Sequence, residues 1–387
     1  MNNLNIFCFI LNVIVIIICG VIFAITPMVT RKQYLFGVKI PSEAVTNPKV
    51  KAMKKSYVAL CLAGMAVVLT IIAAQYMFKP DLSLVMTLYY PFMIIAIQFT
   101  VFIAKWRLAL KLKKESGWKV NDSVFAETKS SHSRGKLSDM PWGWYIFCFI
   151  IIIATVILTL AKYPGLPDRI PTHYDINMQP DAWADKSLWA VMLLPVTNLF
   201  MLMMMWVVGF MYIRAKLQID PQKPALSFAQ HRVYRRRMGH SIGFLALGLV
   251  ILFALLGFMS VFEGFTLSFA AIIAIPIVAS IPIIIVPIYS GQGGCKIKLD
   301  ADEMQNNVTP ENMSVSPAQG LKSGDDKHWK LGTFYYNPDD PAHIVEDRFG
   351  FNIGWNYSRL WIKITAAVLI IGIVALYVWV TPLLLGI

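Results

Sequence analysis

The stretch "WGWYIFCFIIIIATVILTLA", residues 142–161, contains no charged side chain. A helix rises 1.5 Å per residue, so a run of this length crosses the roughly 30 Å hydrocarbon core of a bilayer. Further uncharged runs of similar length recur along the chain. They cover residues 4–26, 57–78, 82–104, 188–213, 240–262, 266–289 and 364–386. The sequence therefore predicts an all-α integral membrane protein with eight transmembrane helices.

Lys and Arg are unevenly distributed among the connections between these runs. Residues 27–56, 105–141, 214–239 and 290–361 hold 7, 9, 7 and 7 of them, whereas the alternate connections hold only Lys79, Lys162, Arg169 and Lys186. Basic connections remain in the cytoplasm, so we expect both termini outside the cell. The net charge of +13 then reflects topology and attraction to the lipid bilayer. Direct nucleic-acid binding is not expected.

The spans and connections suggest five regions. These are residues 1–139 with three spans, 140–213 with an outside loop at 162–187, 214–289 with two spans, 290–361 as a long cytoplasmic loop, and 362–387 with the last span. The stretch "WRLALKLKK", residues 106–114, is expected to extend the third span as a basic helix.

The long cytoplasmic loop contains a second kind of pattern. After Gly291–Gly294, which we expect to be flexible, residues 327–359 alternate aromatic and strand-favouring runs with Asn337-Pro338-Asp339-Asp340-Pro341. Asn and Asp cap backbone amides and Pro fixes φ, which favours a turn. A small cytoplasmic β element is therefore predicted at 327–359.

No Asp, Glu, Lys, Arg or His lies in the middle of any predicted span. Ion-coupled transporters and intramembrane proteases usually place such groups there, so both classes are disfavoured. Polar residues such as Gln98 and Asn198 are expected to form interhelical hydrogen bonds. Gly239-His240-Ser241-Ile242-Gly243 matches a nucleophile elbow, but it opens a membrane helix and not a strand-to-helix turn. A small-residue packing face fits better, and neither enzymatic activity nor a cofactor is expected.

The seventh run contains Pro276, Pro282 and Pro287. Each proline removes a helix hydrogen bond, so these residues are hinge candidates. The other interpretation is a static kink packed against its neighbours.

The outside loop reads "YPGLPDRIPTHYDINMQPDAWADKS", residues 163–187. Its prolines favour a stiff, extended path, and Trp183 and Trp189 can anchor it at the membrane surface. Asp175 and Asp185 could join His173 and Asp181 around a cation, but this spacing fits no standard site. No metal is expected. The loop is predicted to be a recognition surface or a lid.

Two parts of the sequence resemble known bacterial domains. The recognition candidates Tyr163, Pro164, Pro167, Pro171, His173, Asp181, Trp183 and Lys186 follow a pattern that closely resembles the SdpI-type family, named for an immunity protein against an exported toxic peptide. Met178 and Ala184 stand where that family usually has glycine. Tyr335, Tyr336, Asn337, Pro338, Asp339, Asp340, Pro341, Arg348, Gly350, Gly354, Trp355 and Asn356 resemble an uncharacterised bacterial domain. That domain is often found in the same proteins as the SdpI-type pattern. The stretch Phe36-Gly37-Val38 with Ile40-Pro41 also resembles such chains.

The resemblance implies a non-enzymatic, multi-pass protein of a Gram-positive plasma membrane. Such a protein would give immunity to an extracellular toxic peptide, or sense one and signal to a cytoplasmic transcriptional regulator. A small-molecule or lipid transporter or channel using the proline-rich seventh span is the first alternative. A structural membrane protein is the second.

Overall fold

A computed structural model describes residues 3–119, 139–175, 177–215, 217, 223–300, 302–303, 326–348 and 353–385. Within these ranges, eight helices are long and apolar enough to cross a membrane, which confirms the predicted number. They are α1 (Asn3–Val29), α2 (Pro48–Phe78), α3 (Ser83–Glu115), α4 (Trp142–Lys162), α5 (Leu188–Arg214), α6 (Pro224–Val261), α7 (Phe269–Ser290) and α10 (Leu360–Leu385). The chain is a multi-pass membrane protein.

Three helices continue well beyond the apolar runs that revealed them. Helix α2 begins at Pro48 and α6 at Pro224, while α3 ends at Glu115. Lys and Arg favour the helical state and can carry a helix out of the hydrocarbon region. The predicted basic extension of the third span is therefore confirmed, and hydropathy alone underestimates the length of these helices.

The chain forms two compact units, which are described separately. Unit 1 contains Met1–Ser130, Lys216–Pro224 and Asn312–Ile387, and unit 2 contains Ser131–Ala215 and Ala225–Glu311.

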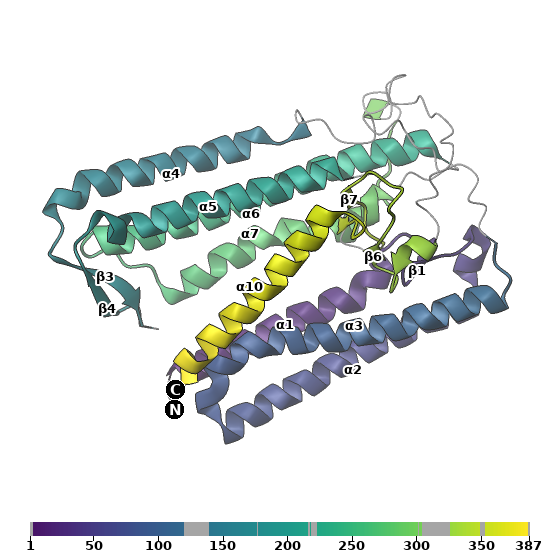
Figure 1. Ribbon diagram of the computed structural model, residues 1–387, viewed down its shortest axis with the longest axis horizontal. Helices are drawn as coiled ribbons and strands as arrows, with labels where there is room; N and C mark the ends of the chain where they lie inside the picture. Colours follow the sequence, from purple (N-terminus) through teal and green to yellow (C-terminus); the bar gives the residue numbers. More distant parts are fainter. Residues whose placement is uncertain are drawn as a thin grey trace. The chain divides into compact units, whose positions relative to one another are not determined.

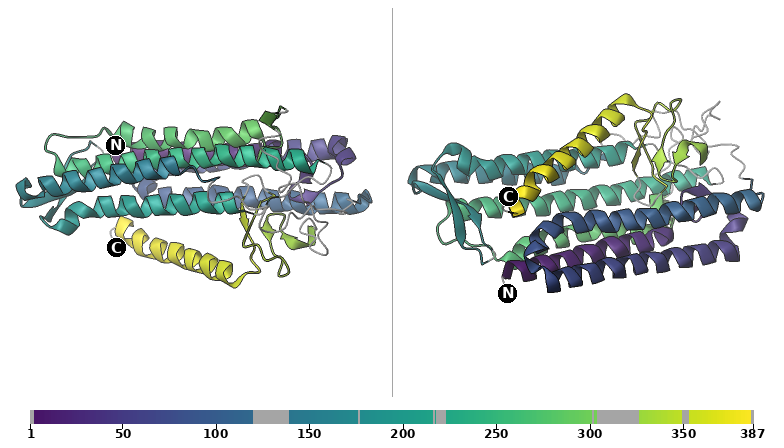
Figure 2. Two further views of the ribbon diagram at one scale, coloured as in Figure 1. Left: turned by 90° about the horizontal axis from the view of Figure 1, so that it is seen from above. Right: turned by 60° about the horizontal axis from the view of Figure 1, so that its bottom comes forward.

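In unit 1, helices α1, α2 and α3 lie side by side (Figures 1 and 2). Ile16, Val68 and Ile94 are fully buried between them. The Gln98 amide donates to the Cys61 carbonyl oxygen at 2.8 Å, which joins α3 to α2 as the sequence predicts. Helix α10 contacts α3 through the Tyr377 hydroxyl, which donates to the carbonyl of Leu88.

The strands of unit 1 are short antiparallel pairs. They are β1 (Tyr34–Leu35) with β2 (Val38–Lys39), β5 (Trp329–Lys330) with β6 (Phe334–Tyr335), and β7 (Ile344–Val345) with β8 (Gly354–Trp355). A parallel bridge between Tyr335 and Asn356 connects the last two pairs. Short 3₁₀ turns at Ser42–Thr46 and Asp326–His328 flank these strands. The side of the membrane on which they lie stays a prediction.

In unit 2, glycines let α6 pack closely on its neighbours. A Cβ atom on Gly243 would lie 2.6 Å from the Trp144 ring of α4, and one on Gly248 would lie 2.4 Å from the Ala279 side chain of α7. The Ser241 hydroxyl donates to the Arg237 carbonyl one turn earlier in its own helix. The prediction that Gly239 and Gly243 form a packing face is confirmed, because Gly239 faces Pro141. Asn198 on α5 donates to the Val250 carbonyl of α6 at 3.0 Å, a second predicted interhelical bond.

The residues after α7 correct one expectation. Gly291–Gly294, expected to be flexible, are buried and include the short 3₁₀ turn Gln292–Gly294. The Gln230 amide of α6 donates to the Ile297 carbonyl at 2.8 Å, which fixes the segment on that helix. The prediction of flexibility is wrong because small glycines here permit close packing. The hinge candidates Pro276, Pro282 and Pro287 all lie inside the single helix α7.

Between α4 and α5, unit 2 carries a longer hairpin (Figure 1). The 3₁₀ turn Tyr163–Gly165 leads into β3 (Arg169–Tyr174), which pairs antiparallel with β4 (Pro180–Asp185). Ser187 then caps α5, because its side chain accepts a hydrogen bond from the Ala190 amide. We call residues 163–187 the β3–β4 hairpin.

Candidate functional site: an anchored hairpin

The base of the β3–β4 hairpin is held by Lys186. Its amide donates to the Asp168 carbonyl at 2.7 Å. Its ammonium donates to the carbonyls of Pro164 at 3.1 Å and Leu166 at 2.7 Å. The same ammonium lies 5.3 Å from the centre of the Tyr163 ring, within cation–π range. Three recognition candidates, Tyr163, Pro164 and Lys186, therefore build the base of the hairpin.

One face of the hairpin is anchored to its own helix bundle. Ile170 is fully buried with Leu166, Val191 and Val261. The Ser260 hydroxyl at the end of α6 donates to the Pro171 carbonyl at 3.1 Å, which gives Pro171 a positioning role.

Tyr174 makes a second polar anchor at the same helix end. Its hydroxyl donates to the Met259 carbonyl at 2.8 Å. Burial raises the pKa of the Tyr174 phenol, so the hydroxyl keeps its proton and remains a donor.

The other face of the hairpin is exposed and polar. His173 Nδ1 and Asp181 Oδ1 lie 2.5 Å apart, although their side chains are 69% and 47% exposed. Trp183 is 47% exposed and pairs with Pro171 in the regular part of the ladder, while Asp181 lies at a register shift of the hairpin. Pro167 is exposed near the start of the hairpin. The structure thus brings His173 and Asp181 together on an accessible surface, and Trp183 is exposed on the same strand as Asp181.

The tip of the hairpin is an Asx turn. The Asp175 carboxylate accepts from the amides of Asn177 at 2.9 Å and Gln179 at 2.7 Å. Met178 has a φ of 61°, the left-handed conformation that glycine adopts most easily. The turn therefore uses a glycine-like backbone without the glycine that the resembling family has. No group of three or more His, Cys, Asp and Glu side chains suited to a metal occurs among the residues described.

The second set of candidate residues, in unit 1, surrounds a buried arginine. Arg348 Nη1 donates to the Gly37 carbonyl at 2.9 Å and pairs with Asp326 at 2.6 Å. Its guanidinium lies 5.0 Å from the Tyr34 ring centre and 4.8 Å from that of Trp329. Burial raises the pKa of the Tyr34 phenol, while the Arg348 charge opposes that rise. We call this arrangement the Arg348 network.

Asp326 extends the Arg348 network to two further elements. Its carboxylate accepts from Lys113 of α3 at 2.7 Å and from the Lys39 amide of β2 at 3.1 Å. Arg31 pairs with Glu346 at 2.8 Å beside it. The roles of Asp326 and Tyr34 were missed by the sequence analysis. The sequence pattern around Gly37 gave the one indication of this contact, because such a pattern is found in proteins that also contain a region like 327–359.

The turn residues of this region are also structural. Asn356 donates to the carbonyls of Asn337, Asp340 and Ala342 at 2.9, 3.1 and 3.0 Å. The Asp340 carboxylate accepts from the Tyr335 hydroxyl at 2.8 Å. Of the remaining candidates, Tyr336, Pro338 and Asp339 are exposed, Trp355 is half-buried, and Gly350 lies outside the described residues.

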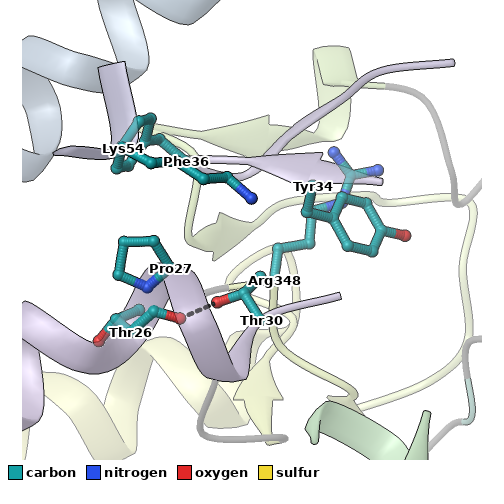
Figure 3. Close-up of a pocket in the computed structure, with 7 residues that line it drawn as sticks. All are labelled: Thr26, Pro27, Thr30, Tyr34, Phe36, Lys54 and Arg348. Atoms are coloured by element: carbon teal, nitrogen blue, oxygen red, sulfur yellow. Dashed lines mark hydrogen bonds between the residues drawn. The ribbon is translucent and has the colours of Figure 1, made fainter. Parts of the chain in front are cut away.

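Figure 3 shows a small pocket beside Arg348. It is lined by Thr26, Pro27, Thr30, Tyr34, Phe36, Lys54 and Arg348 and has room for about one water molecule. The Thr30 hydroxyl on its wall donates to the Thr26 carbonyl at 2.7 Å. A space of this size suits a buried water, which favours an architectural role for the Arg348 network.

One comparison with known proteins gives a match, and the matched segment includes the hairpin. Residues 150–199 match the family model described as a domain of unknown function, DUF1648. No curated protein and no solved structure matches the chain. The matched segment contains most of α4, the whole β3–β4 hairpin and the first part of α5.

Proposed function

We propose that this chain is a non-enzymatic protein of a Gram-positive plasma membrane that recognises an extracellular toxic peptide. Recognition occurs on the β3–β4 hairpin, as the resemblance to the SdpI-type family implies. The protein either protects the cell directly or signals to a cytoplasmic transcriptional regulator.

One observation carries the proposal. The hairpin is fixed to its bundle through Ile170 and the Ser260–Pro171 contact, while its other face leaves His173 and Asp181 accessible. A polar pair held on a rigid support loses little conformational freedom on binding, which favours recognition.

The orientation is part of the proposal. The connections rich in Lys and Arg alternate with poor ones, and the hairpin belongs to the poor set. This pattern favours an N-out and C-out chain with the hairpin outside. The small β element of unit 1 would then lie in the cytoplasm, where residues 105–141, 214–239 and 290–361 are available to a regulator.

The test is survival of toxin-sensitive Gram-positive cells that express the full chain. Cells are challenged with a panel of exported antimicrobial peptides, and variants are matched for abundance in the membrane. His173→Ala removes one partner of the exposed pair, and Thr172→Ala changes its exposed neighbour as a control. We expect the wild type and Thr172→Ala to protect, and His173→Ala to lose most of the protection.

Two results would contradict the proposal. Equal protection by His173→Ala and Thr172→Ala would remove the hairpin pair from the function. Failure of the wild type to protect against any peptide of the panel would direct attention to transport, which flux assays on Pro276→Ala and Pro282→Ala would measure.

A further inference from the structure

We propose that the free edge of β4 binds an extended, cationic peptide as a third strand of the hairpin. This inference rests on the proposed function, since it assigns a binding mode and a ligand class to the same hairpin. It concerns the backbone of β4, which the His173 test does not address.

The register shows which backbone groups point away from the hairpin. In an antiparallel pair, hydrogen-bonded and non-hydrogen-bonded residue pairs alternate. The Lys186 amide donates to the Asp168 carbonyl, so residues 168 and 186 form a hydrogen-bonded pair. Going along the register, Ile170 and Ala184 form the next one. Arg169 with Asp185, and Pro171 with Trp183, are therefore non-hydrogen-bonded pairs whose N–H and C=O groups point outward.

The outer edge of β3 agrees with this assignment and is already occupied. Pro171 has no N–H to lose at its outward position. Its outward carbonyl accepts a hydrogen bond from the Ser260 hydroxyl of α6. The edge of β3 thus faces its own bundle.

The outer edge of β4 has no such cover. The N–H and C=O groups of Trp183 and Asp185 point outward, and they have no hydrogen-bond partner within the described part of the chain. Asp181, Ala182, Trp183 and Asp185 are all exposed. A row of free backbone groups on an edge strand is a template for strand addition by an extended peptide.

The side chains of β4 define the chemistry of the added strand. Side chains alternate along the regular part of the β4 ladder, so Trp183 and Asp185 share one face, whereas register shifts beside His173 interrupt this alternation at Asp181. The Asp185 carboxylate makes no ion pair or hydrogen bond with the residues that the structure describes. The Asp185 carboxylate beside the Trp183 indole favours Lys or Arg at the peptide positions that lie on this face, which are alternate residues of an extended strand. The structure therefore points to a cationic peptide with alternating basic residues.

The experiment measures binding to the purified full chain in a neutral detergent. The probe is a fluorescein-labelled octapeptide of alternating Lys and Val, and its counterpart has Glu in place of Lys. Fluorescence anisotropy gives the dissociation constants. We expect the Lys peptide to bind and the Glu peptide to bind at least about tenfold more weakly, because repulsion replaces attraction at the edge.

Two substitutions of Asp185 distinguish the contribution of its carboxylate charge from that of its backbone N–H. Asp185→Asn removes the charge and keeps the N–H, so we expect affinity for the Lys peptide to fall about threefold, as for an exposed ion pair. Asp185→Pro also removes the outward N–H, so we expect about a tenfold further loss. Proline is compatible with this position because the N–H is not used within the hairpin. Slow hydrogen exchange at the Ile170 amide verifies that the hairpin remains formed.

Each outcome has a defined meaning. Equal affinities of Asp185→Pro and Asp185→Asn, or no binding of the Lys peptide to the wild type, overturn the inference. If His173→Ala loses cell protection and Asp185→Pro keeps it, the inference of an edge site is overturned and the proposed function remains intact. If Asp185→Pro binds the Lys peptide more weakly than Asp185→Asn, and the chain protects cells against no peptide, the edge site is supported and the proposed function is overturned.

Discussion

The β3–β4 hairpin and the Arg348 network handle polar residues in opposite ways. The His173 and Asp181 side chains are 69% and 47% exposed, although they contact each other. The Arg348 side chain has no exposed surface, and a carboxylate, a carbonyl and two aromatic rings surround it. Both regions were selected from the sequence by the same kind of resemblance.

The difference separates residues that can meet a ligand from residues that hold the fold. In the hairpin, Lys186 and Tyr174 support an exposed face. In unit 1, Asn356, Asp340 and Arg348 form hydrogen bonds with neighbouring backbone and side chains. A pattern of polar residues in a sequence therefore does not by itself locate a binding surface, and the solvent exposure of the side chains distinguishes the two cases.

The largest effect is expected from Arg348→Met. Loss of the buried cation leaves Asp326 without its closest partner and removes the donor to the Gly37 carbonyl, which should lower local stability by about 3–5 kcal/mol. Native-state hydrogen exchange at the amides of β5 and β6 measures this change. Lys330→Met, at an exposed position of β5, is the control. Equal exchange in the two variants would mean that the network does not stabilise these strands.

A somewhat smaller loss of stability is expected from Gly37→Ala. Gly37 has a φ of +80°, and a Cβ atom there would lie 1.9 Å from the Gly332 carbonyl oxygen, where the β1–β2 and β5–β6 turns meet. Left-handed strain and overpacking together should cost about 2–4 kcal/mol. Gly354→Ala is the matched control, because its nearest new contact is at 3.8 Å. Thermal unfolding in detergent should show a clear drop for the first variant only, and similar midpoints would disprove this tight contact.

The membrane helices were predictable because hydropathy is a local property. The apolar run at 142–161 corresponds closely to α4, Trp142–Lys162. In contrast, Arg348 and Gly37 are 311 positions apart in the chain, so no local pattern could pair them. Likewise, the burial of Gly291–Gly294 depends on contacts with α6 that their glycine-rich sequence does not reveal.

The hairpin was partly predictable. Its prolines correctly indicated an extended segment, and the sequence selected His173, Asp181 and Trp183. The positioning roles of Lys186 and Pro171 could not be deduced, because they depend on the register and on the end of α6. A proline within a strand usually opposes pairing. Pro171 is tolerated because its position needs no donor.

The smallest expected effect concerns the turn of the hairpin, at Met178. A side chain in the left-handed region is strained, so Met178→Gly should stabilise the hairpin by about 1 kcal/mol. Hydrogen exchange at the Ile170 amide would then slow by about fivefold, as RT ln 5 is about 1 kcal/mol. Asn177→Gly is the control at the adjacent residue, where φ is not positive, and it should destabilise the hairpin by about 0.5–1 kcal/mol through added backbone freedom. Faster exchange in Met178→Gly would show that contacts of the methionine side chain outweigh its backbone strain. The Met178 side chain at the hairpin tip would then help to hold the exposed face of the hairpin in position.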